Sequence, residues 1–557
     1  MQAPLWGRGH SANRARVTAT SSRIAAFADR RPKLVALLLG AVSATGFAPL
    51  NLWPLTLLAL GAWMALVARS PKGWRAFGIG WAFGIGHFVI GLNWIATAFT
   101  YQAAMPAWLG WIAVVLLSLY LAVYPALAAW GAWLVRRWGE PATRLTAPSY
   151  ILAFAGLWTL TEWLRSWVFT GFAWNPLGAI AIGFAQPAQW IGTYGLSGLV
   201  FIVTAIYVLP YLQRRAPGDA PPEISERQQL LFQLGFGVVI AMFLALAYFK
   251  PFPPSERRTA TGTIPITVVQ PNVGQQDKWE GSKADANFAK LARLTAPKDD
   301  SPRLILWPEA AIPDYLETGY PLPYYDRSPA EVRGRLTSLM NPNDLLLLGA
   351  LKLELDKAGD VVGARNAVMM IHADGTLGPR YDKSHLVPYG EYLPMRPILS
   401  AIGLSRLAPG DIDFWPGPGP HTLDLGAFGK AGLQICYEII FSGQVVDRAH
   451  RPDFIFNPSN DAWFGAWGPP QHLAQARLRA IEEGLPVVRA TPTGISAVID
   501  ANGRVLTSIP MHKAGRIDTV VPPAHAPTLF ARHGNMLPVG FALLLLALAI
   551  AFRRRGR

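Results

Sequence analysis

The chain has 557 residues, of which 51% are hydrophobic and only 15% carry a charge. This balance is too apolar for a purely soluble domain and indicates a membrane protein. Lys and Arg number 50 against 35 Asp and Glu, a net charge of +15. Such an excess is typical of nucleic-acid binding, of contact with anionic lipid, or of the cytoplasmic loops of a polytopic protein, and the positions of the basic residues decide among these.

Eight apolar segments approach the length needed to cross roughly 30 Å of hydrocarbon. They are 34–49, 52–68, 76–98, 107–135, 148–168, 191–212, 229–249 and 535–552. The first two are short and are separated only by "GFAPLNLWP", so a helical hairpin and a single broken helix both fit them. We count them as two spans, which predicts seven spans within 34–250 and an eighth near the end.

The basic residues of the loops test this count independently. Seven lie in the tail 1–33, none in the first loop, and further groups alternate with loops that lack Lys and Arg. These groups are Arg69, Lys72 and Arg75; Arg136, Arg137 and Arg144; Arg214, Arg215 and Arg227; and the basic residues of 553–557. By the positive-inside rule both tails are cytoplasmic. The alternation also accounts for much of the net charge without nucleic acid.

The segment 255–530 has a different residue pattern from the predicted spans that flank it. Short β-rich runs such as "IPITVVQPNV", "DLLLLGALKL", "NAVMMIHADG" and "GISAVIDANGRVL" alternate with turns and polar helical stretches. This pattern predicts an α/β domain large enough to bury its own core, entered through the linker "FKPFPPSERR". Seven crossings from the cytoplasm place it outside the inner membrane, in the periplasm of a Gram-negative cell.

Cys436 is the only cysteine, so it has no partner in the chain for a disulfide. A single Cys is often an inert buried hydrophobe, but "LQI" before it indicates a buried strand, and reactive groups collect just past such strands. A thiol needs a base to become a nucleophile. Glu309 follows the apolar run "LILW", and Lys383, His385 and Glu391 crowd the stretch "YDKSHLVPYGEYLP". Each stretch alone also fits a charged surface loop, and residue type alone favours a Cys-His pair.

Together, "WPE", "YDKSHLVPYGEY" and "ICYE", in this order, resemble the nitrilase superfamily of carbon-nitrogen hydrolases. The resemblance starts at "VVQPNV" and includes "NPSNDAWFG". Joined to the predicted spans, it extends to the apolipoprotein N-acyltransferase family of bacterial inner membranes. It implies a polytopic α-helical membrane protein with an inserted αββα sandwich, and a triad of Glu309, Lys383 and Cys436. His385 then becomes a loop residue.

The mechanism that this resemblance implies is covalent, ping-pong acyl transfer. Glu309 takes the proton of Cys436, whose sulfur attacks a phospholipid ester, and Lys383 stabilises the oxyanion. The acceptor is the α-amine of a diacylglyceryl-cysteine at the N-terminus of an apolipoprotein. The single Cys and the lack of H-x-x-x-H and H-E-x-x-H spacings argue against a zinc site, and we expect no cofactor, no metal and a monomer in the bilayer.

Supporting residues follow from the same resemblance. Glu391, Tyr437 and Glu438 fall on positions that the family uses around its site. We expect Glu391 to hold Lys383 or to polarise the site, and Tyr437 and Glu438 to position the turn that carries the nucleophile. The sequence departs from the family pattern at Leu485, where many members have arginine, and at "TPTG", which puts the packing of that loop in doubt.

Several aromatic and charged residues remain open at this level. Five aromatic side chains of the α/β domain fit either mobile lids that enter the lipid interface or ordinary core positions. They are Trp307, Trp415, Trp463, Phe464 and Trp467. Glu162 and Arg165 share one face of the fifth span, where ionisable groups are functional candidates, although Arg165 also fits a side chain that reaches to the interface.

Three other functions stay as alternatives. A membrane-tethered nitrilase or amidase uses the same triad, but one span would suffice as its tether. A transporter with an accessory domain predicts paired charges in several spans, and this chain offers one such pair. An acyltransferase with a different amine acceptor uses the same fold and residues.

Overall fold

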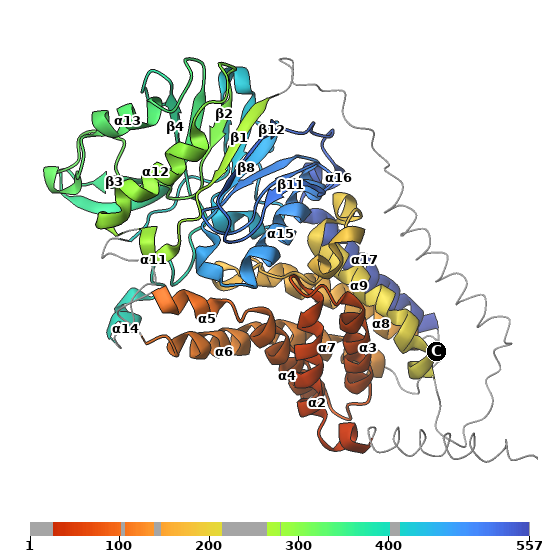
Figure 1. Ribbon diagram of the computed structural model, residues 1–557. Coiled ribbons are helices and arrows are strands. Elements are labelled where there is room, and N and C mark those ends of the chain that lie inside the picture. The colour runs from red at the N-terminus through yellow and green to blue at the C-terminus, as the bar shows by residue number, and fades with distance from the viewer. Residues whose placement is uncertain are drawn as a thin grey trace, which may run out of the picture.

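The computed structural model describes residues 26–101, 106–138, 146–213, 264–278, 280–401 and 413–555. They form two parts: a group of helices and, above it in Figure 1, a pair of β-sheets with helices on their outer faces. The expected span 229–249 lies outside the described residues, as do the whole linker "FKPFPPSERR" and most of the basic tail.

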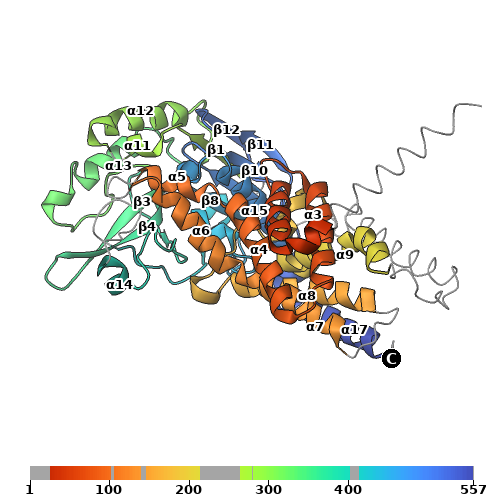
Figure 2. The same cartoon turned by 90° about the horizontal axis from the view of Figure 1, so that it is seen from below.

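The helical part is built from apolar segments close to those expected. Its main helices are α2 (Pro32–Ser43), α3 (Trp53–Ala68), α4 (Gly73–Gly91), α5 (Ile95–Ala98), α6 (Leu109–Leu121), α7 (Val123–Arg137), α8 (Thr146–Arg165), α9 (Ala188–Gln213) and α17 (Met536–Arg555). Helices α5 and α6 reach out beneath the sheets (Figures 1 and 2).

Glycine allows α2 and α4 to pack backbone against backbone. A Cβ atom at Gly40 would lie 1.9 Å from the backbone oxygen of Phe83, and one at Gly86 would lie 2.0 Å from that of Leu37. Any larger side chain would separate the two helices, as is usual where small residues bring membrane helices together.

The number of membrane spans is smaller by strict criteria than the sequence predicts. Within the described residues, three helices are long and apolar enough to cross a membrane: Leu109–Arg137, Ala188–Ala205 and Met536–Arg554. A fourth results if Gly73–Gly91 and Ile95–Tyr101, bent by 50°, count as one span. Pro32–Gly46 and Trp53–Ala68 are apolar but shorter than the roughly 20 residues that a span needs. The prediction of eight spans is therefore not confirmed.

The second part contains two six-stranded mixed sheets. The first has the order β12-β1-β2-β3-β4-β5, with parallel pairs at β1–β2 and β2–β3. Its strands are β1 (Pro265–Gln270), β2 (Leu304–Leu306), β3 (Leu345–Leu355), β4 (Val361–His372), β5 (Tyr381–Asp382) and β12 (Gly515–Val520).

The second sheet has the order β11-β10-β9-β8-β7-β6, again with parallel pairs at its centre, β7–β8 and β8–β9. Its strands are β6 (Thr422–Asp424), β7 (Lys430–Leu433), β8 (Phe454–Pro458), β9 (Val487–Ala490), β10 (Ser496–Ile499) and β11 (Val505–Ile509). Each sheet thus presents the carboxyl ends of its central parallel strands at one edge, where functional side chains gather.

The two sheets pack face to face because their strands alternate in side-chain direction. In β1, Ile266 and Val268 join the core shared with the second sheet, whereas Val269 joins the core on the outer face. Helices α12 (Ala284–Thr295) and α13 (Pro329–Thr337) cover that outer face. The layer order is helix, sheet, sheet, helix, with α15 (Gly468–Glu483) on the other side.

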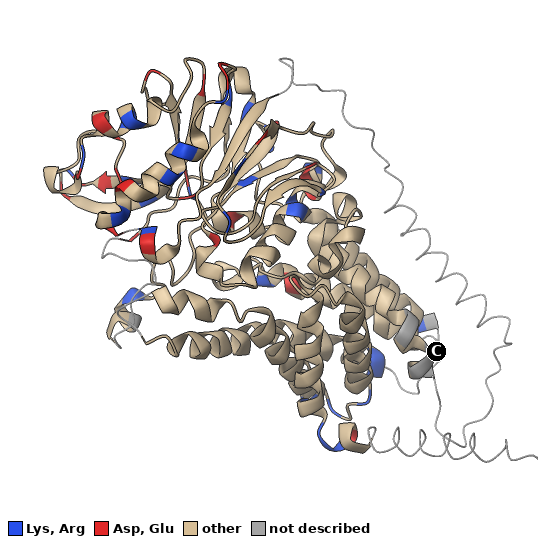
Figure 3. Cartoon of the chain, in the orientation of Figure 1, with Lys and Arg blue, Asp and Glu red and all other residues tan. Residues whose placement is uncertain are grey.

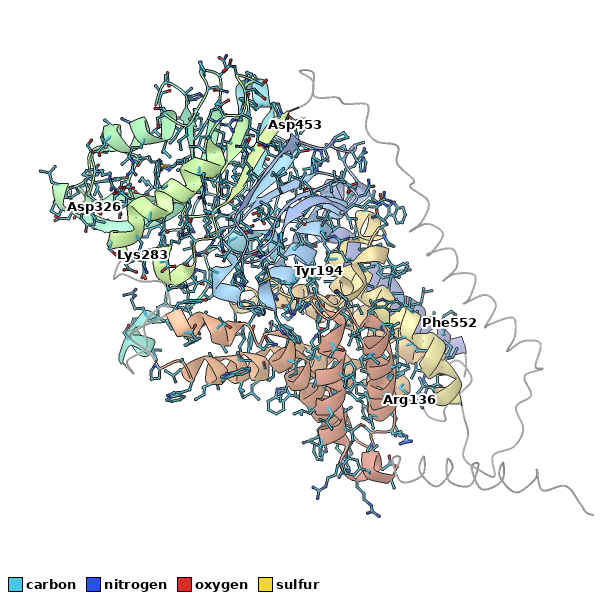
Figure 4. All side chains as sticks on the ribbon, in the orientation of Figure 1. Arg136, Tyr194, Lys283, Asp326, Asp453 and Phe552 are labelled. Carbon is cyan, nitrogen blue, oxygen red and sulfur yellow. The ribbon has the colours of Figure 1, made fainter. Side chains whose placement is uncertain are left out.

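Helix α15 also joins the two parts of the molecule (Figure 1). The indole N–H of Trp174 donates to Gln471 Oε1 at 2.8 Å, and Gln471 Nε2 donates to the Gly91 carbonyl at 3.3 Å. Figure 4 shows Tyr194 of α9 at this boundary and Arg136 toward the opposite end of the helices. The sheets therefore rest on the helical part through direct polar contacts.

Candidate active site

Cys436 stands in a strained turn directly after the second sheet. Strand β7 ends at Leu433, and the single turn η8 (Cys436–Ile440) begins two residues after Gln434. Cys436 has φ of +51°, in the left-handed region, which costs a non-glycine residue about 1–3 kcal/mol and marks many functional sites. Its side chain is buried. The surrounding structure therefore holds this residue in a conformation that it would not adopt alone.

Glu438 ties this turn to the 381–385 loop of the first sheet. Its Oε2 accepts from the Ile435 backbone N–H at 2.7 Å. Its Oε1 accepts from the Tyr381 hydroxyl at 2.9 Å, from the Ser384 N–H at 2.7 Å and from the His385 N–H at 3.1 Å. We call Cys436–Ile440 the nucleophile turn, after the expected role of Cys436. One buried carboxylate thus fixes this turn and the loop that follows Lys383 relative to each other.

Lys383 follows β5 and lies among carboxylates. Its Nζ donates to Glu391 Oε1 at 2.9 Å and lies 3.6 Å from Glu309 Oε1. Burial by itself lowers the pKa of Lys383, but the negative charges of Glu391 and Glu309 outweigh it and raise that pKa. Lys383 is therefore a cation at neutral pH, held in place by Glu391.

Glu309 lies just after β2, buried, with one oxygen committed and one not. Oε1 accepts from Asn366 Nδ2 at 2.7 Å, whereas Oε2 has no hydrogen-bond partner among the described residues. The turn fits only because β3 has glycine beside it: a Cβ at Gly349 would lie 2.6 Å from the Glu309 Cα. A buried carboxylate oxygen without a donor is suited to accept a proton.

The thiol of Cys436 is neutral in this environment. Burial and the nearby charge of Glu309 raise its pKa well above the ordinary value, and Lys383 lowers it by less. The site thus contains a protonated thiol, a carboxylate with a vacant acceptor, and a fixed cation. This set can transfer a proton from sulfur and stabilise a developing oxyanion.

Two further residues of the site, Lys278 and Asn366, escaped the sequence reasoning. Lys278 Nζ donates to the backbone carbonyl of Glu309 at 2.8 Å, and burial lowers its pKa to about 8 although Glu309 and Cys436 raise it. Asn366 Nδ2 bridges Glu309 and Glu391, the latter at 3.1 Å. Lys278 ends the short helix α11 (Gln275–Lys278), which follows β1, and Asn366 lies within β4; no sequence motif marks either residue.

Tyr437 and His385 lie toward the helical part. The Tyr437 hydroxyl donates to the Gly171 carbonyl at 3.5 Å, and its ring packs on Phe441. The His385 ring stacks on Phe441 at 3.7 Å, and its Nε2 lies 3.2 Å from the Thr170 carbonyl. Burial lowers the pKa of His385 to about 4, so the ring is neutral at pH 7. Both side chains line the boundary between the two parts.

Among the aromatic residues, the lid interpretation is wrong for Trp307. Its side chain is fully buried, and its indole N–H donates to Thr295 Oγ1 at 2.9 Å because it faces the outer core of the first sheet. Phe464 is also buried, against Trp94 and Trp174. Trp463 and Trp467 are partly buried, whereas Trp415 is 40% exposed.

Arg165 does not reach to an interface, contrary to one of the expectations above. It is 3% exposed, lies 3.8 Å from Glu162 and donates to the Trp174 carbonyl at 2.9 Å. Glu162 in turn accepts from the Leu177 N–H at 2.8 Å. The pair therefore orders the loop at 171–177 from within the protein.

The unusual loop around Leu485 is well packed. Leu485 is fully buried in a core that includes residues of both sheets and of α15, and Thr491 Oγ1, in "TPTG", donates to Gln270 Oε1 at 3.0 Å. No group of three or more His, Cys, Asp or Glu suited to a metal ion occurs in the part of the chain that the structure describes.

The two sheets and this site define a carbon-nitrogen hydrolase domain: residues 266–521 match the family model described as carbon-nitrogen hydrolase. Residues 39–206 match the apolipoprotein N-acyltransferase N-terminal domain. A solved structure of Saccharomyces cerevisiae Nit3, of the nitrilase superfamily, is 21% identical, covers 49% of this chain and 93% of its own, and has a TM-score of 0.33.

Full-length relatives identify the family. The apolipoprotein N-acyltransferase of Rhodopseudomonas palustris is 34% identical over 536 residues, covering 94% of this chain and 95% of the relative. That of Bradyrhizobium diazoefficiens is 34% identical over 544 residues with the same coverages, and that of Caulobacter vibrioides is 33% identical, covering 86% of each chain. The chain belongs to the apolipoprotein N-acyltransferase family.

Proposed function

We propose that this protein transfers an acyl chain from a membrane phospholipid, through a thioester on Cys436, to the α-amine of the diacylglyceryl-cysteine of an apolipoprotein. One observation carries the proposal: a buried neutral thiol shares its site with the Glu309 carboxylate, which has a vacant oxygen, and with the cation of Lys383. The names of the relatives support the acceptor.

In the first half-reaction Glu309 takes the proton of Cys436 as the sulfur attacks the ester carbonyl carbon. Lys383 stabilises the tetrahedral oxyanion. The carbon–oxygen bond then breaks, and Glu309 returns the proton to the leaving alkoxide, which departs as a lysophospholipid. A thioester on Cys436 remains.

In the second half-reaction the acceptor amine attacks the thioester carbon. Glu309 takes a proton from the amine and delivers it to the departing sulfur, so that the thiol is regenerated and an amide is formed. Glu391 holds Lys383 in place, and Glu438 and Tyr437 position the nucleophile turn and its boundary with the helices. No cofactor takes part.

We place the protein in the bacterial inner membrane as a monomer with eight spans. Charge supports this orientation: Lys and Arg of the helical part gather at the end farthest from the sheets, and the helices between are nearly free of charge in the residues drawn (Figure 3). By the positive-inside rule that end is cytoplasmic, and the sheets are periplasmic.

The test is a two-stage mass measurement on purified protein in mixed micelles. With phospholipid alone, the protein should gain the mass of one acyl chain at Cys436 and release lysophospholipid. A diacylglyceryl peptide with a free amine should then remove the adduct and become triacylated. Glu309→Gln should slow the first stage by about 10²–10⁴-fold, and Lys383→Met by about 10²–10³-fold.

Glu331→Gln, at an exposed position of α13, is the matched control and should leave both stages unchanged. If Cys436→Ser still transfers acyl chains, the covalent mechanism is wrong. Absence of an adduct together with hydrolysis of a small nitrile or amide would establish the tethered hydrolase instead.

A further inference from the structure

A connected group of buried polar side chains makes hydrogen bonds to the backbone at the start of the nucleophile turn. We call Asn457, Arg489, Asp461 and His472 the turn clamp. Asn457 Nδ2 donates to the Gln434 carbonyl at 2.5 Å. At the other end, His472 Nε2 contacts the Cys436 carbonyl at 3.0 Å. The clamp thus makes hydrogen bonds to the backbone on both sides of Ile435, the residue that precedes Cys436.

The middle of the clamp is charge-balanced. Arg489 donates to Asn457 Oδ1 at 2.5 Å and to both oxygens of Asp461 at 2.5 and 2.6 Å. Its Nη2 also lies 3.0 Å from His472 Nδ1. Asn457, Arg489 and His472 are fully buried. Removal of one member would leave a buried partner unsatisfied, which is more costly than loss of an exposed contact.

The direction of the hydrogen bonds follows from the acceptor. A carbonyl cannot donate, so Nε2 of His472 carries the proton that the Cys436 carbonyl accepts. Burial and the charge of Arg489 lower the pKa of His472 by more than the neighbouring Asp461 raises it, so the ring is neutral at pH 7. Its Nδ1 accepts from Arg489 Nη2 at 3.0 Å and also lies 3.0 Å from Asp461 Oδ1, whose negative charge Arg489 balances. His472 therefore acts as a fixed donor to the backbone and not as a base for the thiol.

We propose that His472 is a positioning residue for acyl transfer: through the clamp it holds the Cys436 carbonyl and so maintains the left-handed backbone that aims the thiol at Glu309. The proposal rests on the function proposed above for Cys436. The left-handed backbone of Cys436 carries a strain cost that surrounding contacts offset, and His472 donates a hydrogen bond to that residue's own carbonyl.

Packing has to be separated from hydrogen bonding, because the His472 ring also contacts Trp174 and Phe464, with centroids at 5.1 and 5.6 Å. His472→Phe keeps an aromatic ring but removes the donor. His472→Gln loses the ring but keeps an N–H donor close to the Nε2 position. If the hydrogen bond positions the thiol, His472→Phe should react more slowly than His472→Gln. If only the ring matters, His472→Gln should be the slower variant.

The experiment measures single-turnover acylation of Cys436 by phospholipid in the full chain, without acceptor, by quenched-flow mass measurement. A misplacement of a reacting atom by about 1 Å costs about 10²-fold. We expect His472→Phe to lower the maximal rate about 100-fold with half-saturation by phospholipid unchanged within about twofold, and His472→Gln to stay within about tenfold of the wild type. Asn457→Ala, at the other end of the clamp, should lose about tenfold.

A second readout does not need lipid. Because Cys436 is the only thiol in the chain, alkylation by iodoacetamide reports on this residue alone. The alkylation rates of the folded variants should follow the same order as their acylation rates. His525→Gln, at a partly buried histidine that faces Asn502, is the control and should change neither rate. Acylation of His472→Phe at the wild-type rate, or equal loss in the Phe and Gln variants, would overturn the proposal. Persistent transfer by Cys436→Ser would instead overturn the proposed function.

Discussion

The chemistry of the site depends on how burial and two nearby charges act on one thiol. Burial and Glu309 both favour the neutral form of Cys436, whereas Lys383 favours the thiolate. A thiol whose pKa lies above its ordinary value of about 8.5 carries little negative charge at pH 7. In the proposed mechanism the thiolate therefore forms only when Glu309 takes the proton during attack.

This electrostatic balance predicts a pH dependence. Because the pKa of Cys436 is raised, the alkylation rate of the wild type should still increase with pH above 9, where an ordinary thiol has levelled off. Glu309→Gln removes a negative neighbour while Lys383 remains, so the pKa should fall and the rise should begin at lower pH. The measurement is the rate of iodoacetamide addition by mass between pH 6 and 10. An unchanged profile in Glu309→Gln would show that its carboxylate does not act on the sulfur.

At the scale of elements, α9 is broken where α15 meets it. Gly192 has φ of +67°, and a Cβ there would lie 2.3 Å from the Phe530 ring. After the break, the N–H of Thr193 donates to Glu482 Oε1 at 2.6 Å, so a carboxylate of α15 caps the helix that follows. Glu482 also pairs with Arg479 at 2.7 Å, and Arg479 donates to the Ile440 carbonyl at the end of the nucleophile turn. Helix α15 thus makes polar contacts with both the nucleophile turn and the apolar helix α9.

Adjacent glutamates of α15 provide a matched pair for testing this cap. Glu482→Gln removes the charge that faces buried Arg479 and should destabilise the fold by about 3–5 kcal/mol, as loss of a buried partner does. Glu483 is also buried, and burial and the charge of Glu482 raise its pKa to about 7. Since its ionised form is disfavoured in the folded state, Glu483→Gln should be neutral or stabilising at pH 8.

The measurement for this pair is thermal unfolding in detergent at pH 8. We expect the melting temperature of Glu482→Gln to fall by several degrees and that of Glu483→Gln to stay or rise. Equal falls for both variants would mean that the effect comes from polarity at the end of α15 and not from the cap.

At the scale of the whole molecule, the part with the sheets and the helical part contribute different features to the candidate site. The nucleophile turn belongs to the sheets, but the loop at 170–171 of the helical part contacts His385 and Tyr437 beside it. Charged side chains are spread over the part that contains the sheets, including the helices that cover them, and are sparse along the helices of the helical part (Figure 3). The proposed reaction needs this arrangement, because its thiol must meet an ester at the lipid surface while the acyl chains remain in hydrocarbon.

The orientation is testable by single-cysteine labelling in a Cys436→Ala background. Leu322→Cys, at a site 84% exposed in the connection between β2 and α13, should react in spheroplasts with a maleimide that cannot cross the membrane. Trp74→Cys, 62% exposed at the start of α4 beside the basic loop, should react only after lysis. The reverse pattern would contradict a periplasmic catalytic domain.

Local sequence was a good guide to strands and a poorer one to spans. The runs "IPITVVQ", "LLLLGALKL" and "NAVMMIH" form β1, β3 and β4, because apolar β-rich runs bounded by turns have few other stable states. Segments such as Pro32–Ser43 are apolar but short as helices. The lid interpretation failed at Trp307 because exposure depends on which face of a sheet a side chain occupies.

The sequence by itself determined the membrane character, the α/β domain and the family, because composition, periodicity and motif order are properties of the chain alone. Through the family resemblance it also predicted Glu309, Lys383 and Cys436 as the residues of the candidate site. Only the tertiary structure decided that Lys278, Asn366 and the turn clamp surround that site, that Gly349 makes room for Glu309, and that α15 joins the site to α9. These features depend on strands and helices far apart in sequence meeting at one edge, and no local pattern specifies which distant side chain will fill a buried hydrogen bond.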